Sequence, residues 1–199
     1  MPDVNWFRAP TEDDAGTLNA CYNALDIHVI RGRADEVALS IDGTEHSFAR
    51  MLTEVAACAG VLQAFGVGLG DRVTVGFLPP STAVTAVLAA ARVGALARYD
   101  NSAGAAGSVR VGRSTGTADG TITFAVDGDE VPWDVAMRAG RTDPAPCANV
   151  PGDAILCRHG EDAMSVLEAL GATEGPVPTT VGASLVEVGG VTLWVFESA

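Results

Sequence analysis

The chain has 199 residues, 48% of them hydrophobic and 6% aromatic, which suits one globular domain with a real core and excludes a disordered chain. Its 25 acidic and 12 basic residues give a formal net charge of −13, which repels the phosphate backbone of nucleic acid. We therefore predict no nucleic-acid partner. The basic residues are all arginine, so the sequence contains no lysine.

The sequence also argues against a membrane and against an oxidising compartment. It has no apolar run of about 18 residues to span a bilayer, and its N-terminus lacks the basic-then-apolar pattern of a signal peptide. Its four cysteines, Cys21, Cys58, Cys147 and Cys157, form no C-x-x-C pair that would indicate a metal or redox motif. We expect a cytoplasmic protein with reduced thiols.

The first hundred residues alternate between helical and strand patterns. Apolar residues recur at three- and four-residue spacing in the helical segments, and short valine-containing runs separate them. The predicted elements are helices over 17–31, 47–65 and 79–94, strands over 37–41 and 72–78, and a third strand that begins near residue 95. This alternation is typical of an α/β fold with a parallel sheet, and we expect helix 47–65 to pack across one face of it.

The composition changes after Asn101. Residues 102–107 are almost entirely glycine, alanine and serine, and they lack the large apolar side chains of a packed helix. The predicted elements beyond them are strands over 109–111, 121–126 and 153–156, helices over 133–139 and 161–170, a loop over 143–151, and a C-terminal β-hairpin over 184–196 that turns at Gly189-Gly190. We divide the chain into residues 1–101, an α/β region, and residues 102–199, a divergent and shortened remainder of the same domain.

Several motifs of the first half follow one another in a specific order. Trp6-Phe7 precedes GTLN at 16–19 and CYNALDIH at 21–28; RADEVAL at 33–39, GDRV at 70–73 and AAARVGA at 89–95 follow. This series closely resembles the N-terminal part of AMP-forming acetyl- and propionyl-CoA synthetases, which are members of the adenylate-forming, AMP-binding superfamily. The resemblance covers about residues 5–97 and implies a layered α/β domain, in which His28 matches a structural position.

The resemblance also implies motifs that this sequence lacks. The family holds the phosphates of ATP with a Ser/Thr/Gly-rich loop ending in Pro-Lys-Gly and with a second lysine from a C-terminal domain, and this sequence has neither lysine. Arginine is no simple replacement for a lysine on a tight loop. The Phe-Gly-Gly loop beside CoA, the aromatic acyl-pocket motif and the TGD ribose motif are missing as well. We therefore assign no catalytic, cofactor-binding or metal-binding residue.

Two segments stand where a remnant of the phosphate loop could lie. Residues 114–120 (STGTADG) have a composition that can cradle an anion, but Asp119 would face the phosphates and the segment comes too early in the chain. The better alignment places residues 157–162 (CRHGED) there, with two acids where phosphates would dock. We interpret the first segment as a turn and the second as a short connection.

The second segment also holds the one Cys/His/acid cluster of the sequence, Cys157, His159 and Glu161. A catalytic Cys–His pair needs a spatial arrangement that sequence alone does not give. The spacing is unfavourable for a metal ion, which leaves a polar loop as the simpler interpretation.

Our hypothesis is a stand-alone, truncated acetyl/propionyl-CoA synthetase-like protein that is non-catalytic and acts as an interaction module, by self-association or through a protein partner. We expect no cofactor and no binding of ATP or CoA, because the sequence has neither a Gly-rich loop with a cation nor a C-terminal lid to enclose a nucleotide. The fold could still bring together the arginines that are spread along the chain: Arg110, Arg113, Arg138, Arg141 and Arg158. An edge strand, or the apolar hairpin around Trp194, would offer the surface. The alternative is one piece of a split AMP-forming ligase whose lysines come from another chain.

Overall fold

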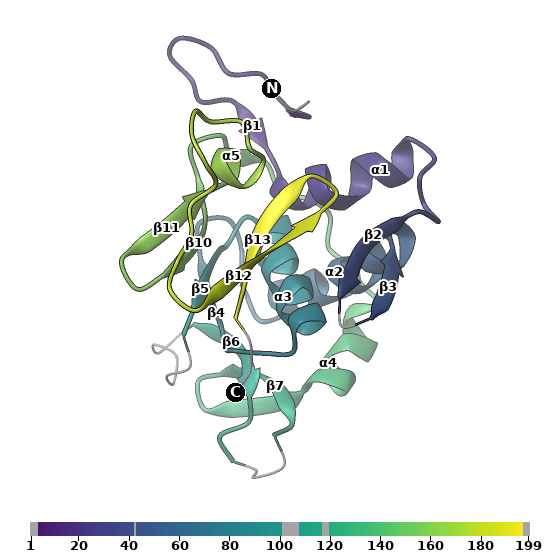
Figure 1. Cartoon of the computed structure of the whole chain (residues 1–199). Coiled ribbons are helices and arrows are strands. Elements are labelled where there is room, and N and C mark those ends of the chain that lie inside the picture. The colour runs from purple at the N-terminus through teal and green to yellow at the C-terminus, as the bar shows by residue number, and fades with distance from the viewer. Residues whose placement is uncertain (1–3, 42, 101–107, 117–119, 197–199) are drawn as a thin grey trace.

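The computed structural model describes residues 4–41, 43–100, 108–116 and 120–196, and is built on one mixed sheet (Figure 1). Four neighbouring strands at its centre are parallel, and antiparallel strands extend it at both edges. In spatial order the strands are β11 (Asp162–Ser165), β10 (Ile155–His159), β5 (Leu96–Tyr99), β4 (Arg72–Val75), β6 (Val109–Arg113), β7 (Ile122–Val126) and β8 (Asp129–Pro132). The α/β fold class predicted from the sequence is thereby confirmed.

The parallel core arises from a strand–helix–strand unit in the first half. β4 leads into α3 (Pro80–Val93), and β5 returns parallel to β4 in the register Val73↔Ala97 and Val75↔Tyr99. Pro80 occupies the first helical turn, where its missing N–H costs nothing. Gly94 ends the helix in the left-handed conformation at φ 79°. β4 is shorter than predicted, because it ends at Val75 rather than at residue 78.

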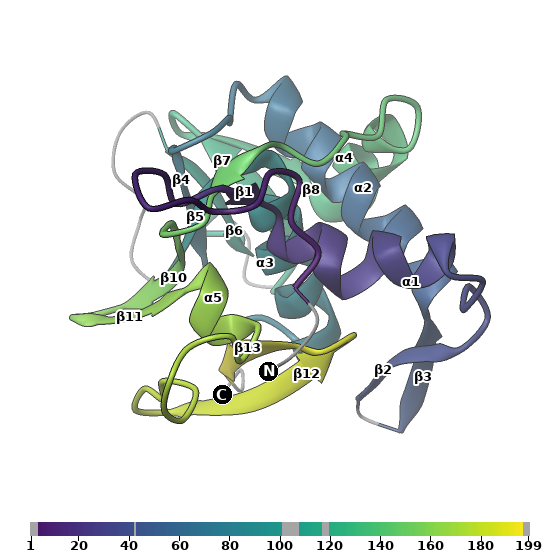
Figure 2. The same ribbon diagram turned by 90° about the horizontal axis from the view of Figure 1, so that it is seen from above.

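The long helix α2 (Phe48–Ala64) confirms the helix predicted over 47–65, with Ser47 as its N-cap. It packs against α3 and against α4 (Trp133–Gly140), and all three helices lie on the same side of the central sheet (Figure 2). α2 and α4 approach very closely, since a Cβ atom added at Gly140 would lie 2.1 Å from the carbonyl oxygen of Ala57. Only glycine permits this backbone contact.

The strand over 37–41 does not belong to the parallel sheet, contrary to expectation. β2 (Val37–Ile41) pairs antiparallel with β3 (Thr44–Ser47), and the two form a separate two-stranded sheet. The reason is local: Ile41 pairs with Thr44, and Gly43 before it has φ 71°, so the chain reverses before a crossover helix can begin.

The helix predicted over 17–31 begins later than expected. Thr17–Leu18 form β1, which pairs with β9 (Val150–Pro151), and the helical segment starts at Ala20. It contains a π-helical turn, η1 (Tyr22–Asp26), followed by α1 (Ile27–Ile30).

The helix predicted over 161–170 is mostly wrong. β11 takes up its first half, because this segment pairs with β10, and only α5 (Val166–Ala169) is helical. Ser165 caps α5 in a capping box with Glu168, so the start signal for the helix lies four residues later than predicted.

The C-terminal hairpin is present as predicted, with β12 (Ala183–Val188) and β13 (Val191–Phe196) joined at Gly189-Gly190. Its Trp194 is not a surface residue, however: the side chain is fully buried and its indole N–H donates to the carbonyl oxygen of Pro178 at 2.8 Å. The hairpin covers the helix side of the sheet, where the hydroxyl group of Tyr99 donates to the Trp194 carbonyl oxygen. Within the described residues, no helix is long and apolar enough to cross a membrane.

Candidate functional site

The loop after β6 does bind an anionic group, and that group belongs to this chain. Ser114 and Thr115 donate their hydroxyls to the carboxylate of Glu130 on β8, and the backbone N–H of Thr115 donates to it at 2.9 Å. The hydrogen bond from Ser114, followed by that from the Thr115 N–H, lowers the pKa of Glu130. Asp119, whose charge argues against a phosphate in this loop, lies outside the described residues.

The second candidate segment forms the β10–β11 hairpin turn, and its Cys/His/acid cluster does not form a catalytic pair. The thiol of Cys157 is fully buried, and this burial raises its pKa, which disfavours the nucleophilic thiolate. The Nδ1 atom of His159 lies 3.0 Å from Thr180 Oγ1, which in turn donates to Asp162 at 2.7 Å. The imidazole ring packs on Phe196, with 4.5 Å between ring centroids, so His159 is held as part of the packing.

His28 is likewise engaged in packing. Its ring stacks on Phe48 at a centroid distance of 4.4 Å, and its Nε2 donates to the carbonyl oxygen of Gly189 at 2.9 Å. These contacts join the helical segment 20–30 to the C-terminal hairpin.

Three arginines lie in one row across the central sheet. The strand register pairs Arg158 on β10 with Arg98 on β5, Arg98 with Thr74 on β4, and Thr74 with Arg110 on β6. Residues paired in this way point to the same face of a sheet. That face is opposite to the one bearing Tyr99, so it is turned away from the helices and the C-terminal hairpin. Arg110 and Arg158, which are far apart along the chain, are thus brought onto one face of the sheet. We call Arg98, Arg110 and Arg158 the arginine row.

The charges of the arginine row are only partly compensated within this chain. Arg98 lies 3.6 Å from Asp100, and both Arg98 and Arg158 are exposed. Within the described residues, the Arg158 guanidinium meets no hydrogen-bond or ion-pair partner, and the buried Nε of Arg110 meets no hydrogen-bond acceptor. Arg110 lies one strand further away, is buried, and donates through Nη1 to the Arg113 carbonyl oxygen. Arg98 and Arg158 lie on adjacent strands, where like charges repel one another, so this pair favours an anionic group above the row. No sequence signal predicts it, because register between strands is set by the fold.

A second polar cluster lies between the N-terminal helical segment and the loop before β9. The guanidinium of Arg92 donates to both carboxylate oxygens of Asp26, at 2.8 and 3.1 Å, and its Nε donates to the carbonyl oxygen of Ala145 at 2.7 Å. Burial is the largest influence on the pKa of Arg92 and lowers it, but the hydrogen bond with Asp26 and the interactions with Cys21 and Cys147 together raise it more, so the net pKa is raised. Arg92 is therefore a permanent buried cation.

Cys21 and Cys147 complete this cluster. Their sulfur atoms and a carboxylate oxygen of Asp26 all lie within 4.8 Å of one another, and Arg92 Nη1 lies 3.5 Å from the sulfur of Cys21. The sequence could not predict this proximity, since the two cysteines are far apart in the chain and share no spacing motif. Two sulfurs and a carboxylate are potential metal ligands, but Asp26 is already bound by Arg92, whose charge repels a metal cation.

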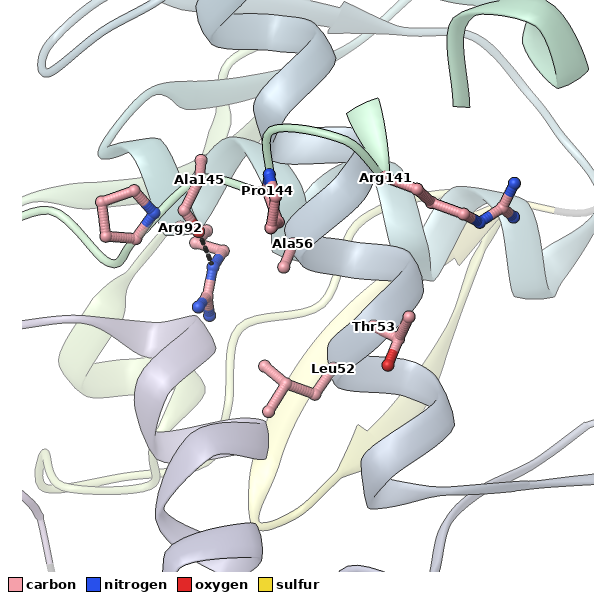
Figure 3. A pocket seen from close by; sticks show the side chains of 8 residues that line it. Leu52, Thr53, Ala56, Arg92, Arg141, Pro144 and Ala145 are labelled. Atoms are coloured by element: carbon pink, nitrogen blue, oxygen red, sulfur yellow. Dashed lines mark hydrogen bonds between the residues drawn. The ribbon is translucent and has the colours of Figure 1, made fainter. Parts of the chain in front are cut away.

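A cavity of about 450 Å³ opens beside this cluster (Figure 3). Leu52, Thr53 and Ala56 of α2 form one wall, and Pro144, Ala145 and Pro146 of the loop form another. Figure 3 shows Arg92 between these walls, hydrogen-bonded to Ala145, with Arg141 at the far end. Arg141 is held there by Glu54 at 2.7 Å. The cavity is mostly apolar, and both its cations are already paired.

Comparison with known proteins identifies relatives for part of the chain. No family model matches. An acetyl-coenzyme A synthetase of Rhodopirellula baltica is 38% identical over 108 residues, covering 48% of this chain and 15% of the relative. The acetyl-coenzyme A synthetase of Streptomyces coelicolor is 39% identical over 101 residues, with 47% of this chain and 14% of the relative covered.

A mitochondrial relative and a solved structure extend the comparison. The rat acyl-CoA synthetase short-chain family member 3 is 36% identical over 101 residues, covering 48% of this chain and 14% of the relative. The crystal structure of the anthranilate CoA ligase AuaEII with anthranoyl-AMP matches with a TM-score of 0.39 and 25% identity, over 43% of this chain and 16% of that one. The chain thus spans only about a seventh of its curated relatives' length. About half of this chain is related to acetyl-CoA synthetases and short-chain acyl-CoA synthetases, as the motifs of residues 5–97 predict.

Proposed function

We propose that this chain is an acyl-CoA synthetase-like module that binds an acidic partner protein through the arginine row and catalyses no adenylation by itself. The observation that carries the proposal is the row itself: arginines of three strands in register on one sheet face of a chain whose net charge is −13. Their mutual repulsion is relieved when an anionic surface lies above them.

A protein partner fits the row better than a nucleotide does. The exposed members of the row, Arg98 and Arg158, lie side by side on adjacent strands, whereas Arg110 is buried. The cavities described in this structure are lined by other residues. A nucleotide needs donors that converge on its phosphates, but the donors of the loop after β6 are taken by Glu130. A protein surface with several carboxylates can instead contact the exposed guanidinium groups of Arg98 and Arg158.

Binding is tested with poly-L-glutamate as a defined acidic ligand, in titration calorimetry at low salt. Replacing Arg158 by Glu should weaken binding by about tenfold or more, because it puts a like charge against the ligand. The matched control is Arg138→Glu on α4, exposed and away from the row, which changes the net charge by the same amount. If both variants lost the same affinity for poly-L-glutamate, the change in net charge would explain the loss, and a role for the row would be refuted.

The same proposal requires that the 199-residue chain alone release no pyrophosphate from ATP with acetate or propionate. The absence of lysine and the occupied loop leave the developing phosphate charge without donors, and the loss of even one such donor costs about 10²–10³ in rate. Pyrophosphate release above a heat-inactivated control would contradict the proposal that the chain alone catalyses no adenylation. Micromolar binding of ATP or CoA would contradict the preference for a protein.

A second candidate is favoured by the identity with acetyl-CoA synthetases: this chain is one piece of an acyl-CoA ligase that another chain completes. The partner would supply the lysines that contact the phosphates. In that case acyl-adenylate formation appears only when both chains are mixed, which the same pyrophosphate assay detects.

A further inference from the structure

We propose that Cys21 and Cys147 form a reversible intramolecular disulfide, with low-molecular-weight disulfides such as oxidised glutathione as the oxidant class. Nothing in the proposed binding function requires this bond. It would fasten the helical segment 20–30 to the loop over 143–149 beside the cavity of Figure 3.

The two sulfur atoms are already neighbours. They lie within 4.8 Å of each other, and a disulfide needs about 2.05 Å, a difference that side-chain rotation and a small loop shift can supply. Cys147 sits in a loop of irregular structure between α4 and β9. Cys58 and Cys157 are buried in other places, on α2 and β10, and are not part of this cluster.

The surroundings give the two thiols different roles. Cys147 is half-buried, whereas Cys21 is fully buried, so an oxidant from solvent reaches Cys147 first. Arg92 Nη1 lies 3.5 Å from the Cys21 sulfur and holds it in the cluster beside Cys147. Because Cys21 is buried and next to Cys147, it is placed to be the second, resolving nucleophile.

The chemistry balances in two exchange steps. The Cys147 thiolate attacks one sulfur of glutathione disulfide, forms a mixed disulfide and releases one glutathione thiolate. The Cys21 thiolate then attacks the Cys147 sulfur and releases the second glutathione. The two protons lost by the cysteines are taken up by the two glutathione thiolates, and the protein's two-electron oxidation matches the reduction of one glutathione disulfide.

The cluster also sets the expected pH dependence of the first step. The hydrogen bond to Cys21, followed by burial, raises the pKa of Cys147, and Asp26 adds to the shift. Arg92 lowers it in part. The ionisable groups described around the Cys147 thiol are therefore Cys21, Asp26 and Arg92. Because only the thiolate attacks, oxidation should become faster as the pH rises.

The test uses the full chain incubated with a gradient of reduced to oxidised glutathione. The expected product has lost the mass of two hydrogens, titrates two thiols instead of four, and gives a tryptic cross-link between the peptides of residues 9–31 and 142–158. Fragmentation must place the link on Cys147 and not on Cys157, which shares the second peptide. The melting temperature of the oxidised form should rise by about 5–10 °C, since the bond closes a long loop.

Two variants make the result decisive. Cys147→Ser, at a half-buried loop position, should abolish the cross-link and the rise in melting temperature, while Cys157→Ala should keep both. Four free thiols at every glutathione ratio, or a stable glutathione adduct on Cys147 without the cross-link, would overturn the proposal. Stoichiometric binding of Zn²⁺ that protects Cys21 and Cys147 from alkylation would overturn it as well, because the pair would then be a metal site.

Discussion

At the scale of single residues, Arg92 connects three segments of the chain that are distant in sequence. It lies on α3, is almost fully buried, and connects the helix to Asp26 of the π-helical turn and to the backbone of Ala145 in the loop before β9. Three segments that are distant in sequence thus share one cation. Breaking such a pair by removing one partner leaves an uncompensated charge in the interior.

We therefore predict that Arg92→Met lowers the free energy of unfolding by about 3–5 kcal/mol. Asp26 would keep its buried charge, and the Ala145 carbonyl would lose its donor. Urea denaturation at pH 7 measures the change. Arg141→Met is the control: its pair with Glu54 is substantially exposed, and we expect a change of about 0–1 kcal/mol. Similar losses in both variants would contradict the structural role of Arg92.

Glu130 gives a pH-dependent prediction at the same scale. Its folded-state pKa is depressed by Ser114 and Thr115, so its contribution to stability is present above the unfolded pKa of about 4.3 and is lost as the pH falls through the folded value. Glu130→Gln should be slightly less stable than the parent at pH 7. This difference should shrink below about pH 4.

Thermal melting between neutral and acid pH measures the difference. Glu187→Gln, exposed on β12, is the control and should not lose stability at pH 7. A difference for Glu130→Gln that stays constant into the acid range would show that the carboxylate is not what the loop after β6 binds.

At the scale of elements, the turn of the C-terminal hairpin determines how the hairpin docks. Gly189 has φ 56°, and a Cβ atom there would lie 2.1 Å from the carbonyl oxygen of Ala24 and 2.8 Å from the ring of His28. Gly190 has φ 87°, but a Cβ atom there would meet nothing within 4 Å. The two glycines share a conformational requirement and differ in the space around them.

This difference predicts unequal effects of the same substitution. Gly190→Ala should cost about 1–2 kcal/mol from backbone strain alone. Gly189→Ala should cost at least about twice as much, because the hairpin must also move away from residues 24–28. Chemical denaturation of both variants gives the comparison, and equal losses would mean that the hairpin is not anchored at Ala24.

Most elements could be predicted from the sequence, because periodicity and end signals are local. Helix 47–65 and the hairpin at Gly189-Gly190 have the expected limits, since Ser47 and the glycine pair mark them. The pairing of strands depends on contacts between segments that are distant in sequence. The short apolar pattern of β2 resembles that of a strand in the central sheet, yet β2 pairs with β3 in a separate sheet. The helix predicted over 161–170 is mostly wrong for the same reason, because its first half pairs with β10 and forms β11.

The site residues were harder to predict than the elements. The arginine row depends on the register of four strands, and the Cys21–Cys147 pair depends on a contact between segments more than a hundred residues apart. Neither leaves a spacing motif in the sequence. The resemblance of residues 5–97 to the synthetases could be recognised, because it rests on consecutive residues whose order the relatives share.

At the scale of the whole molecule, net charge and local charge have opposite signs. The chain carries −13, so it repels an acidic ligand at long range, while the arginine row attracts one at contact. Added salt weakens both effects, which makes the salt dependence of binding to the parent protein hard to interpret by itself. Two variants with the same net charge remove the long-range contribution from the comparison.

We predict that the ratio of the dissociation constants of Arg158→Glu and Arg138→Glu for poly-L-glutamate falls with salt. At about 0.05 M salt the ratio should be about ten or more, and at about 0.5 M, where the screening length is only a few ångströms, it should approach one. Both variants have the same formal charge, so the long-range repulsion cancels and only the contact at the row remains. Titration calorimetry at three salt concentrations measures the ratio. A ratio near one already at low salt would place the acidic ligand elsewhere on the molecule, and a ratio that stays large at high salt would mean that Arg158 contributes by packing rather than by its charge.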